Sequence, residues 1–200
     1  MTPTSPLAYR RSLEDRLRVV AAETGRDLGW VRRRHVFIRV LHRLVGNQPD
    51  SWVLKGGFAV ELRRPGLARA TRDIDLTVRS AGLAGDGLEA LPRSLASALA
   101  GDVDGDGFGF TIGRVTPLAE DACGRPSWRY SIDASLAGKS FVAFHLDVVE
   151  RPEELVELTT LALPAGTAPP PGAGPRVVVV TDLRAVRRET ACPDPQLRDR

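Results

Sequence analysis

The sequence has 200 residues, of which 42% are hydrophobic, and its formal net charge is +3. These values suit one globular domain and exclude a disordered chain. No apolar run approaches the roughly 20 residues that cross a bilayer, and the N-terminus lacks a signal-peptide pattern, so no membrane partner is expected. Cys123 and Cys192 have no ligand-like neighbours, which favours a reducing, cytoplasmic location.

Apolar periodicity predicts helices in the first part of the chain. The stretch SLEDRLRVVAAETG reads as a helix that opens at Ser12 and closes at Gly25, and Asp27 can cap a second helix, LGWVRRRHVFIRVLHRLVG. A short third helix, GFAVELRR, is expected to begin at the glycine pair 56–57, and LEALPRSLASALAG reads as a fourth.

Arginines crowd the first third of the chain, at Arg10, Arg11, Arg16, Arg18, Arg32, Arg33, Arg34, Arg39 and Arg43. Such a concentration favours a polyanionic partner, and a solvated helix surface would explain it equally well. Both interpretations stay open at the level of the sequence.

Strands follow the helices. Alternating apolar and polar residues predict strands in RDIDLTVR, GFGFTIGRV, SWRYSIDASL and SFVAFHLDVVE. Helices that cluster first and strands that cluster later suit an α/β (α+β) fold, with a mixed β-sheet and helices packed on one face.

The remaining segments complete the predicted organisation. The stretch EELVELTTLALP is expected to be a helix closing the sheet, PAGTAPPPGAGP a linker and RVVVV a last strand. Residues 102–107, DVDGDG, match half a calcium loop, but Gly113 stands where a bidentate Glu is required, so an acidic turn is predicted. We therefore divide the chain into N-terminal helices (1–50), a core (51–163), and a linker, last strand and atypical tail (164–200).

One stretch carries candidate chemistry. Gly56 and Gly57 at a helix start allow a ligand to approach the backbone, with N–H groups facing an anion such as a triphosphate. Asp73 and Asp75 are two residues apart on a strand, so both project from one face and could hold two Mg²⁺ ions about 3.5–4 Å apart. A D-x-D pair also occurs by chance on exposed strand edges, and that alternative stays open.

A third carboxylate could join this pair. In FVAFHLDVVE, Asp147 and His145 lie on the face opposite Phe144 and Leu146. If this strand lies beside the Asp73–Asp75 strand, three acids converge on one cleft. We expect His145 to be a neighbour of the metal site and no ligand, because Mg²⁺ prefers oxygen. Without the earlier motif, Asp147 would read as a polar residue on a solvated face.

In this order, WVLKGGFAVELR, RATRDIDL and FHLDVV resemble the nucleotidyl transferase AbiEii/AbiGii toxin family of the DNA-polymerase-β-like nucleotidyltransferases. The resemblance covers residues 7–149. It implies catalytic, metal-binding roles for Asp73, Asp75 and Asp147. It also implies a nucleotide-binding role for Lys55, Gly56, Gly57, Thr71 and Arg72.

The same resemblance implies an activity. Such toxins transfer a nucleoside monophosphate from an NTP to an acceptor, in some members tRNA, with Mg²⁺, and they are paired with a cognate antitoxin encoded nearby in phage-defence modules. The arginine-rich second helix would then face tRNA phosphates.

The C-terminal end departs from the family pattern. Members continue after the last strand with a helical region that supplies an active-site Lys and a later acid, whereas here RVVVV is followed by TDLRAVRRETACPDPQLRDR. We therefore expect a truncated helical region. The tail after Thr181 is compatible with a one-base slip of the coding frame near Val180, and such a tail should pack poorly.

Two alternatives to an active toxin-like enzyme stay open. One is a catalytically inactive remnant that binds nucleotide, RNA or an antitoxin, which the absent lysine favours. The other is a small-molecule nucleotidyltransferase that modifies an antibiotic.

Overall fold

The computed structural model describes residues 5–49, 51–65, 71–78, 91–102, 104–120, 126–149, 158–164 and 177–181. The helices within these ranges are α1 (Pro6–Thr24), α2 (Leu28–Asn47), α3 (Gly56–Arg63) and α4 (Leu91–Ala100). The strands are β1 (Trp52–Lys55), β2 (Asp73–Val78), β3 (Phe108–Leu118), β4 (Ser127–Leu136), β5 (Lys139–Val149), β6 (Leu158–Ala162) and β7 (Val177–Thr181). None of the helices in these ranges is long and apolar enough to cross a membrane.

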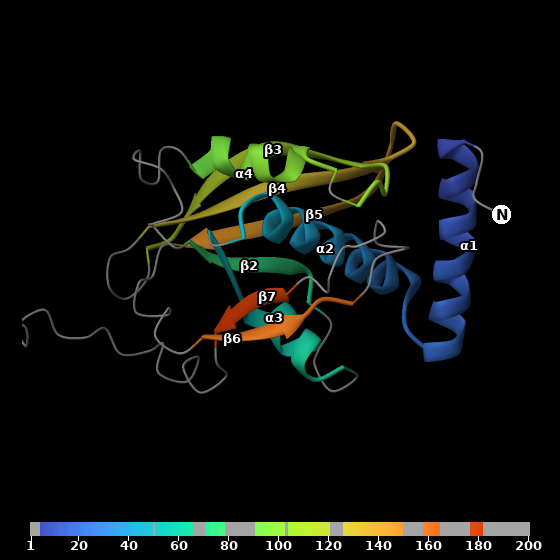
Figure 1. The fold of residues 1–200 in the computed structure, drawn as a ribbon, viewed down its shortest axis with the longest axis horizontal. Helices are drawn as coiled ribbons and strands as arrows, with labels where there is room; N and C mark the ends of the chain where they lie inside the picture. The colour runs from blue at the N-terminus through green and yellow to red at the C-terminus, as the bar shows by residue number, and fades with distance from the viewer. Residues whose placement is uncertain are drawn as a thin grey trace, which may run out of the picture.

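The strands form one mixed sheet in the order β3-β4-β5-β2-β1-β7-β6 (Figure 1). The β2–β5 and β1–β7 pairs are parallel, and the other neighbours are antiparallel. The prediction of a mixed α/β fold with N-terminal helices is therefore confirmed.

Local signals in the sequence explain where α1 begins and ends and where α2 begins. Gly25 adopts a left-handed conformation with φ 64° and ends α1, as predicted. The side chain of Asp27 accepts a hydrogen bond from the backbone N–H of Trp30 and caps α2, also as predicted. Helix α1 starts earlier than expected, because Ser5 accepts from the backbone N–H of Ala8 and Pro6 suits the first turn.

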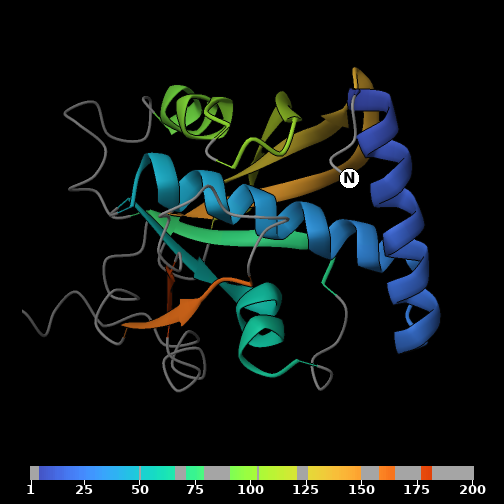
Figure 2. The same cartoon turned by 45° about the vertical axis from the view of Figure 1, so that its right-hand side comes forward.

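The hydrophobic core lies between α2 and one face of the sheet. Phe37 of α2 contacts Phe144 of β5 and Phe58 of α3, with ring centroids 5.0 and 5.1 Å apart. Ile74 and Leu76 of β2 belong to the same buried cluster. Figure 2 shows α2 lying across the strands with α4 on the same side. The alternating strands therefore turn their polar residues to the face opposite α2.

Two strands differ from the sequence-based expectation. The predicted helix over EELVELTTLALP is wrong in its second half, because Leu158–Ala162 is strand β6, antiparallel to β7. The β-branched Thr159 and Thr160 favour this conformation, and β7 offers them a hydrogen-bonding partner. Strand β1 was not anticipated, because its four residues are too few to show alternation.

The last strand predicted from RVVVV is present as β7, beside β1. The predicted linker, apart from Pro164, lies outside the described residues, as does the tail after Thr181.

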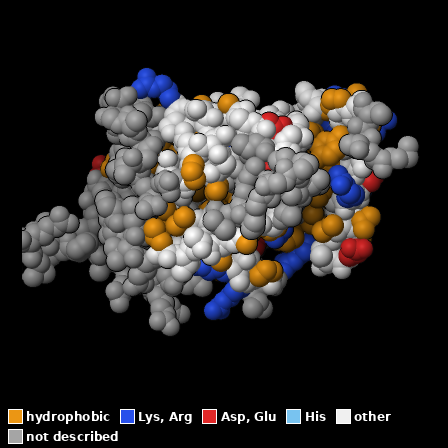
Figure 3. Space-filling model, in the orientation of Figure 1, with side chains coloured by type: hydrophobic (Ala, Val, Ile, Leu, Met, Phe, Trp, Pro, Cys, Tyr) orange, Lys and Arg blue, Asp and Glu red, His pale blue; other side chains and the backbone are white. Residues whose placement is uncertain are grey.

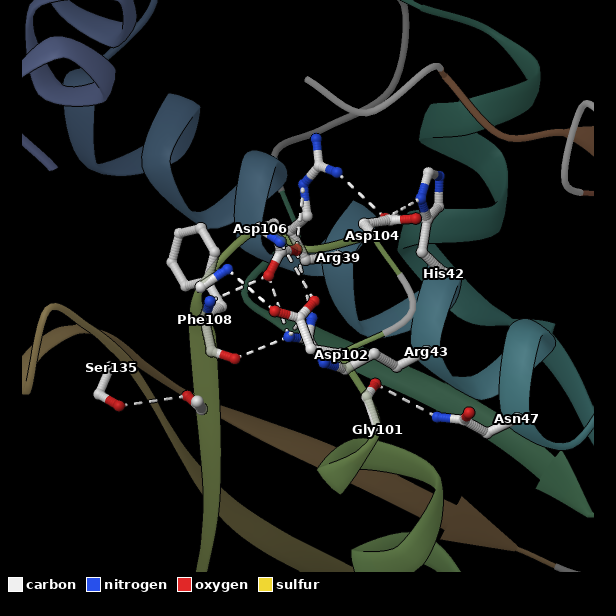
Figure 4. A network of polar contacts seen from close by, with 12 residues as sticks. Arg39, His42, Arg43, Asn47, Gly101, Asp102, Asp104, Asp106, Phe108 and Ser135 are labelled. Carbon is white, nitrogen blue, oxygen red and sulfur yellow. Dashed lines mark hydrogen bonds and ion pairs between the residues drawn. The ribbon is translucent and has the colours of Figure 1, made fainter. Parts of the chain in front are cut away.

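The acidic segment after α4 is a turn, as predicted, and it anchors α2 (Figure 4). Asp104 lies 2.6 Å from Nδ1 of His42 and accepts a hydrogen bond from Arg39 at 3.2 Å. Asp106 accepts two hydrogen bonds from Arg43, at 2.9 and 3.2 Å. Because these side chains are buried, the pairs join α2 to the start of β3 in a medium of low dielectric constant.

Burial and ion pairing therefore limit what the arginines of α2 could contribute to the predicted tRNA-facing surface. Arg39 and Arg43 are only 2% and 1% exposed. Arg32 bonds to Glu14 of α1, and Arg34 pairs with Glu61 of α3 at 3.2 Å. These four side chains hold helices and turns together.

Arg10 of α1 has a comparable role. Its guanidinium donates hydrogen bonds to the backbone carbonyls of Leu136, Lys139 and Ser140 at the β4–β5 hairpin. Arg10 thus bonds within the fold, whereas Arg11, Arg16 and Arg18 of the same helix are exposed.

We predict that Arg43→Ala destabilises the protein by about 3–5 kcal/mol, because Asp106 then stays buried without its principal counter-charge. Urea unfolding followed by circular dichroism measures this. Arg18→Ala is the matched control, since it breaks an exposed arginine–aspartate pair with Asp15 and should be nearly neutral. An equal loss in both variants would contradict a structural role for the buried network.

Candidate active site

The strand registers place a row of charged residues across four strands. Asp75 of β2 pairs with Asp147 of β5 on one side and with Lys55 of β1 on the other. Arg129 of β4 pairs with Asp147 in turn. Paired residues of neighbouring strands share a face, so all four project from the face opposite α2. The expected adjacency of the Asp147 strand and the Asp73–Asp75 strand is therefore confirmed.

A second row lies next to the first. Asp73 pairs in register with His145, and Nδ1 of His145 lies 3.6 Å from Oδ1 of Asp73. The side chain of His145 is 47% exposed, so it borders the acids as expected. Three carboxylates and one imidazole thus gather on the face of β2 and β5 that is turned away from α2.

Arg129 is the site residue that sequence reasoning missed. Its Nε donates a hydrogen bond to Oδ1 of Asp147 at 2.8 Å, and its Nη2 donates to Oδ2 at 2.7 Å. The same Nη2 lies 3.6 Å from Oδ2 of Asp73. These hydrogen bonds to Asp147 raise the pKa of the Arg129 guanidinium above its ordinary value. A bidentate guanidinium therefore neutralises part of the acid cluster.

Burial and neighbouring charges both act on the pKa of Asp75. Burial raises the pKa of Asp75 above its ordinary value, and the nearby Asp147 and Asp73 carboxylates raise it further. Lys55 and Arg129 act in the opposite direction without cancelling the rise. Ionised Asp75 is thus disfavoured, first by its burial and then by its neighbouring carboxylates.

The glycine pair brings a helix start against these acids. Helix α3 begins at Gly56, as predicted, and Gly56 has a φ of +63°. A Cβ at Gly56 would lie 2.0 Å from Oδ2 of Asp75. A Cβ at Gly57 would lie 2.9 Å from Oγ1 of Thr71, which donates a hydrogen bond to the backbone carbonyl of Asp73. Only residues without a side chain allow this close approach.

The donor chemistry of the cluster fits Mg²⁺, which prefers carboxylate oxygens. As they stand, the described residues include no group of three His, Cys, Asp or Glu side chains that could hold a metal ion. Both oxygens of Asp147 accept hydrogen bonds from Arg129. A metal ion at these acids would therefore compete with the Arg129 guanidinium for the charge of Asp147.

A separate cavity of about 640 Å³ lies between α1, α2 and α3, and the predicted site residues do not line it. Figure 3 shows hydrophobic and basic side chains side by side along the inner edge of α1. Burial, aided by Arg39, lowers the pKa of the cavity-lining His35 to about 3, so this side chain is neutral. The acids lie instead on the face of the sheet opposite α2.

The sequence of this region identifies the family. Residues 39–185 match the nucleotidyl transferase AbiEii toxins of type IV toxin–antitoxin systems. The chain belongs to this family. The matched range contains Lys55, the glycine pair and all three acids.

Other comparisons add only a likeness in shape. No curated protein matches the chain. Among solved structures it is similar to MenT4, a nucleotidyltransferase toxin from Mycobacterium tuberculosis H37Rv, with a TM-score of 0.49 and 16% sequence identity. The match covers 84% of this AbiEii-family chain and 55% of the MenT4 chain, so this chain spans little more than half the length of that protein.

We predict that Gly56→Ala destabilises the protein by clearly more than Gly25→Ala. Both glycines have a φ near +64°, so alanine costs about 1–2 kcal/mol of backbone strain at either position. The space around Gly25 is open, whereas a Cβ at Gly56 collides with Asp75. Urea unfolding of both variants isolates the collision, and equal losses would show that α3 does not press on the acid cluster.

Proposed function

We propose that this protein transfers a nucleoside monophosphate from an NTP to a hydroxyl acceptor, with Asp73, Asp75 and Asp147 as its metal-binding acids. The observation that carries the proposal is the three carboxylates on neighbouring parallel strands, with the start of α3 directly against Asp75. In the reaction the acceptor oxygen bonds to the α-phosphorus, the bond to the β-phosphate oxygen breaks, pyrophosphate leaves and the acceptor proton passes to solvent.

Different residues would bind the metal ions and the triphosphate. The three acids would hold two Mg²⁺ ions, which when bound would activate the attacking hydroxyl and neutralise charge on the leaving pyrophosphate. Backbone N–H groups at Gly56 and Gly57 would face the triphosphate at the positive end of α3. Lys55, beside Asp75 on β1, would add a positive charge to the same place.

Two further residues border the proposed nucleotide site. Thr71 lies against Gly57 and supports the backbone of Asp73, so it would hold the glycine turn in place. Arg72 is exposed and immediately precedes Asp73, where its charge would reach a phosphate group.

The proposed acceptor is tRNA. The buried arginines of α2 give no support to this choice, so it rests on the family and on the exposed cation Arg72 beside the acids. Labelled product assayed with tRNA and with an aminoglycoside separates an RNA-modifying toxin from an antibiotic-modifying enzyme. Label in the aminoglycoside alone would contradict the tRNA proposal.

We predict that Asp75→Asn abolishes Mg²⁺-dependent incorporation of α-labelled NTP, because the amide cannot replace the charge of a metal ligand. Asp133→Asn is the control, since Asp133 lies on β4 opposite Ala143, away from the acids, and keeps full activity. Wild-type protein that binds nucleotide but incorporates no label would instead favour the inactive binding protein.

The same variant should fold as well as wild type. Because the folded-state pKa of Asp75 is raised above its unfolded value, ionised Asp75 destabilises the fold above that raised pKa. This penalty disappears as the pH falls through the raised pKa. Asp75→Asn should therefore melt at the same or a slightly higher temperature at pH 7, with a smaller difference in acid. A large loss of stability would mark Asp75 as a structural residue.

A further inference from the structure

Arg129 lies between two of the three acids. Its guanidinium makes two hydrogen bonds with Asp147, at 2.7 and 2.8 Å, and lies 3.6 Å from Asp73. It reaches them from β4, a strand that carries none of the proposed acids. One side chain therefore connects the β2 acid to the β5 acid.

This geometry places the guanidinium in competition with a metal ion. A bidentate pair engages one lone pair on each oxygen of Asp147 and fixes the direction in which the carboxylate faces. A divalent cation at the three acids needs those oxygens turned toward Asp73 and Asp75. In its present orientation Asp147 gives the better-directed lone pair of each oxygen to the arginine, so the guanidinium and the ion compete for the same carboxylate charge.

The exposure of the pair makes exchange feasible. The side chains of Arg129 and Asp73 are 35% and 33% exposed, and that of Asp147 is 15% exposed. Water can solvate the guanidinium as it leaves, so the cost of separating this pair is far below that of a fully buried pair. The contrast is Arg43, which is 1% exposed and has no comparable freedom.

A second anion would be within reach of the Arg129 guanidinium once it leaves Asp147. A guanidinium released from Asp147 remains beside the acids, where the phosphates of an NTP would lie. Its planar fork matches two phosphate oxygens as well as it matches a carboxylate. Lys55 approaches Asp75 from the opposite side, on β1, and cannot make a bidentate contact of this kind.

We propose that Arg129 is an exchangeable counter-ion. In the ligand-free protein it holds Asp147 and Asp73. When metal and nucleotide bind together, it releases Asp147 and binds the nucleotide phosphates. The proposal rests on the function proposed above and adds a positioning residue that couples metal binding to nucleotide binding.

The coupling follows from the exchange. Metal alone competes with Arg129 for the charge of Asp147 and Asp73 and offers the guanidinium no new anion in return, so metal alone should bind weakly. Nucleotide supplies the new partner, so each ligand strengthens the binding of the other. Removal of the guanidinium should therefore strengthen the binding of metal alone and weaken the binding of nucleotide.

The test is an electron paramagnetic resonance titration of ligand-free protein with Mn²⁺ alone, followed by titration of the Mn²⁺-loaded protein with non-hydrolysable analogues of the four NTPs. We expect Arg129→Gln to bind Mn²⁺ alone about tenfold more tightly than wild type, because a charge-assisted competitor has been removed. We expect it to bind the preferred NTP analogue about tenfold more weakly.

Two further variants sharpen the result. Arg18→Gln removes an exposed arginine from a pair with Asp15 on α1 and should leave both affinities unchanged. Arg129→Lys keeps the charge and loses the bidentate fork, so its two affinities should fall between those of wild type and Arg129→Gln. This conservative variant decides the question if Arg129→Gln does not fold, which circular dichroism reports.

Failure of this inference is distinguishable from failure of the proposed function. If Asp75→Asn loses Mn²⁺ binding while Arg129→Gln and Arg129→Lys bind Mn²⁺ no more tightly than wild type, the metal site stands and the exchange is wrong. If wild type and all variants bind neither Mn²⁺ nor any NTP analogue, the proposed function is wrong and the exchange fails with it.

Discussion

A slip of one residue between β2 and β5 would turn Ile74 and Leu76 away from α2 and bury the carboxylate of Asp75 in the core. Because the apolar face of β2 must lie under α2, the observed register is strongly specified. The same register places Asp75 directly beside Asp147. Packing of the core and assembly of the acid cluster are thus two consequences of the pairing of β2 with β5. The hydrophobic effect that fixes this pairing holds the carboxylates of Asp75 and Asp147 together against their mutual repulsion.

The protein uses arginine–carboxylate pairs in two settings that differ in burial. Arg43 and Asp106 are both buried and join α2 to the turn before β3, where an unpaired partner would be costly. Arg129 and Asp147 are partly exposed and lie on the face of the sheet opposite α2. Water screens the second pair. An arginine–carboxylate pair is therefore a stable link in the core and an exchangeable contact at the site.

Local patterns predicted the parts of this site that depend on a single segment. The alternation of RDIDLTVR places Asp73 and Asp75 on one face, and the glycine pair marks the start of α3. Arg129 could not be found in this way. The two-residue turn between Leu136 and Lys139 alone would set it opposite Leu146, but the register shifts by one residue between Ala134 and Ser135. Long-range pairing likewise decided that α2 buries Arg39 and Arg43 and that Leu158–Ala162 is a strand.

The most direct measurement of the central claim is anomalous diffraction from crystals grown with Mn²⁺ and a non-hydrolysable NTP analogue. The account predicts Mn²⁺ peaks between Asp73, Asp75 and Asp147, with the triphosphate at the start of α3 and the Arg129 guanidinium turned from Asp147 to phosphate. Nucleotide bound elsewhere, with no anomalous peak at the three acids, would contradict it.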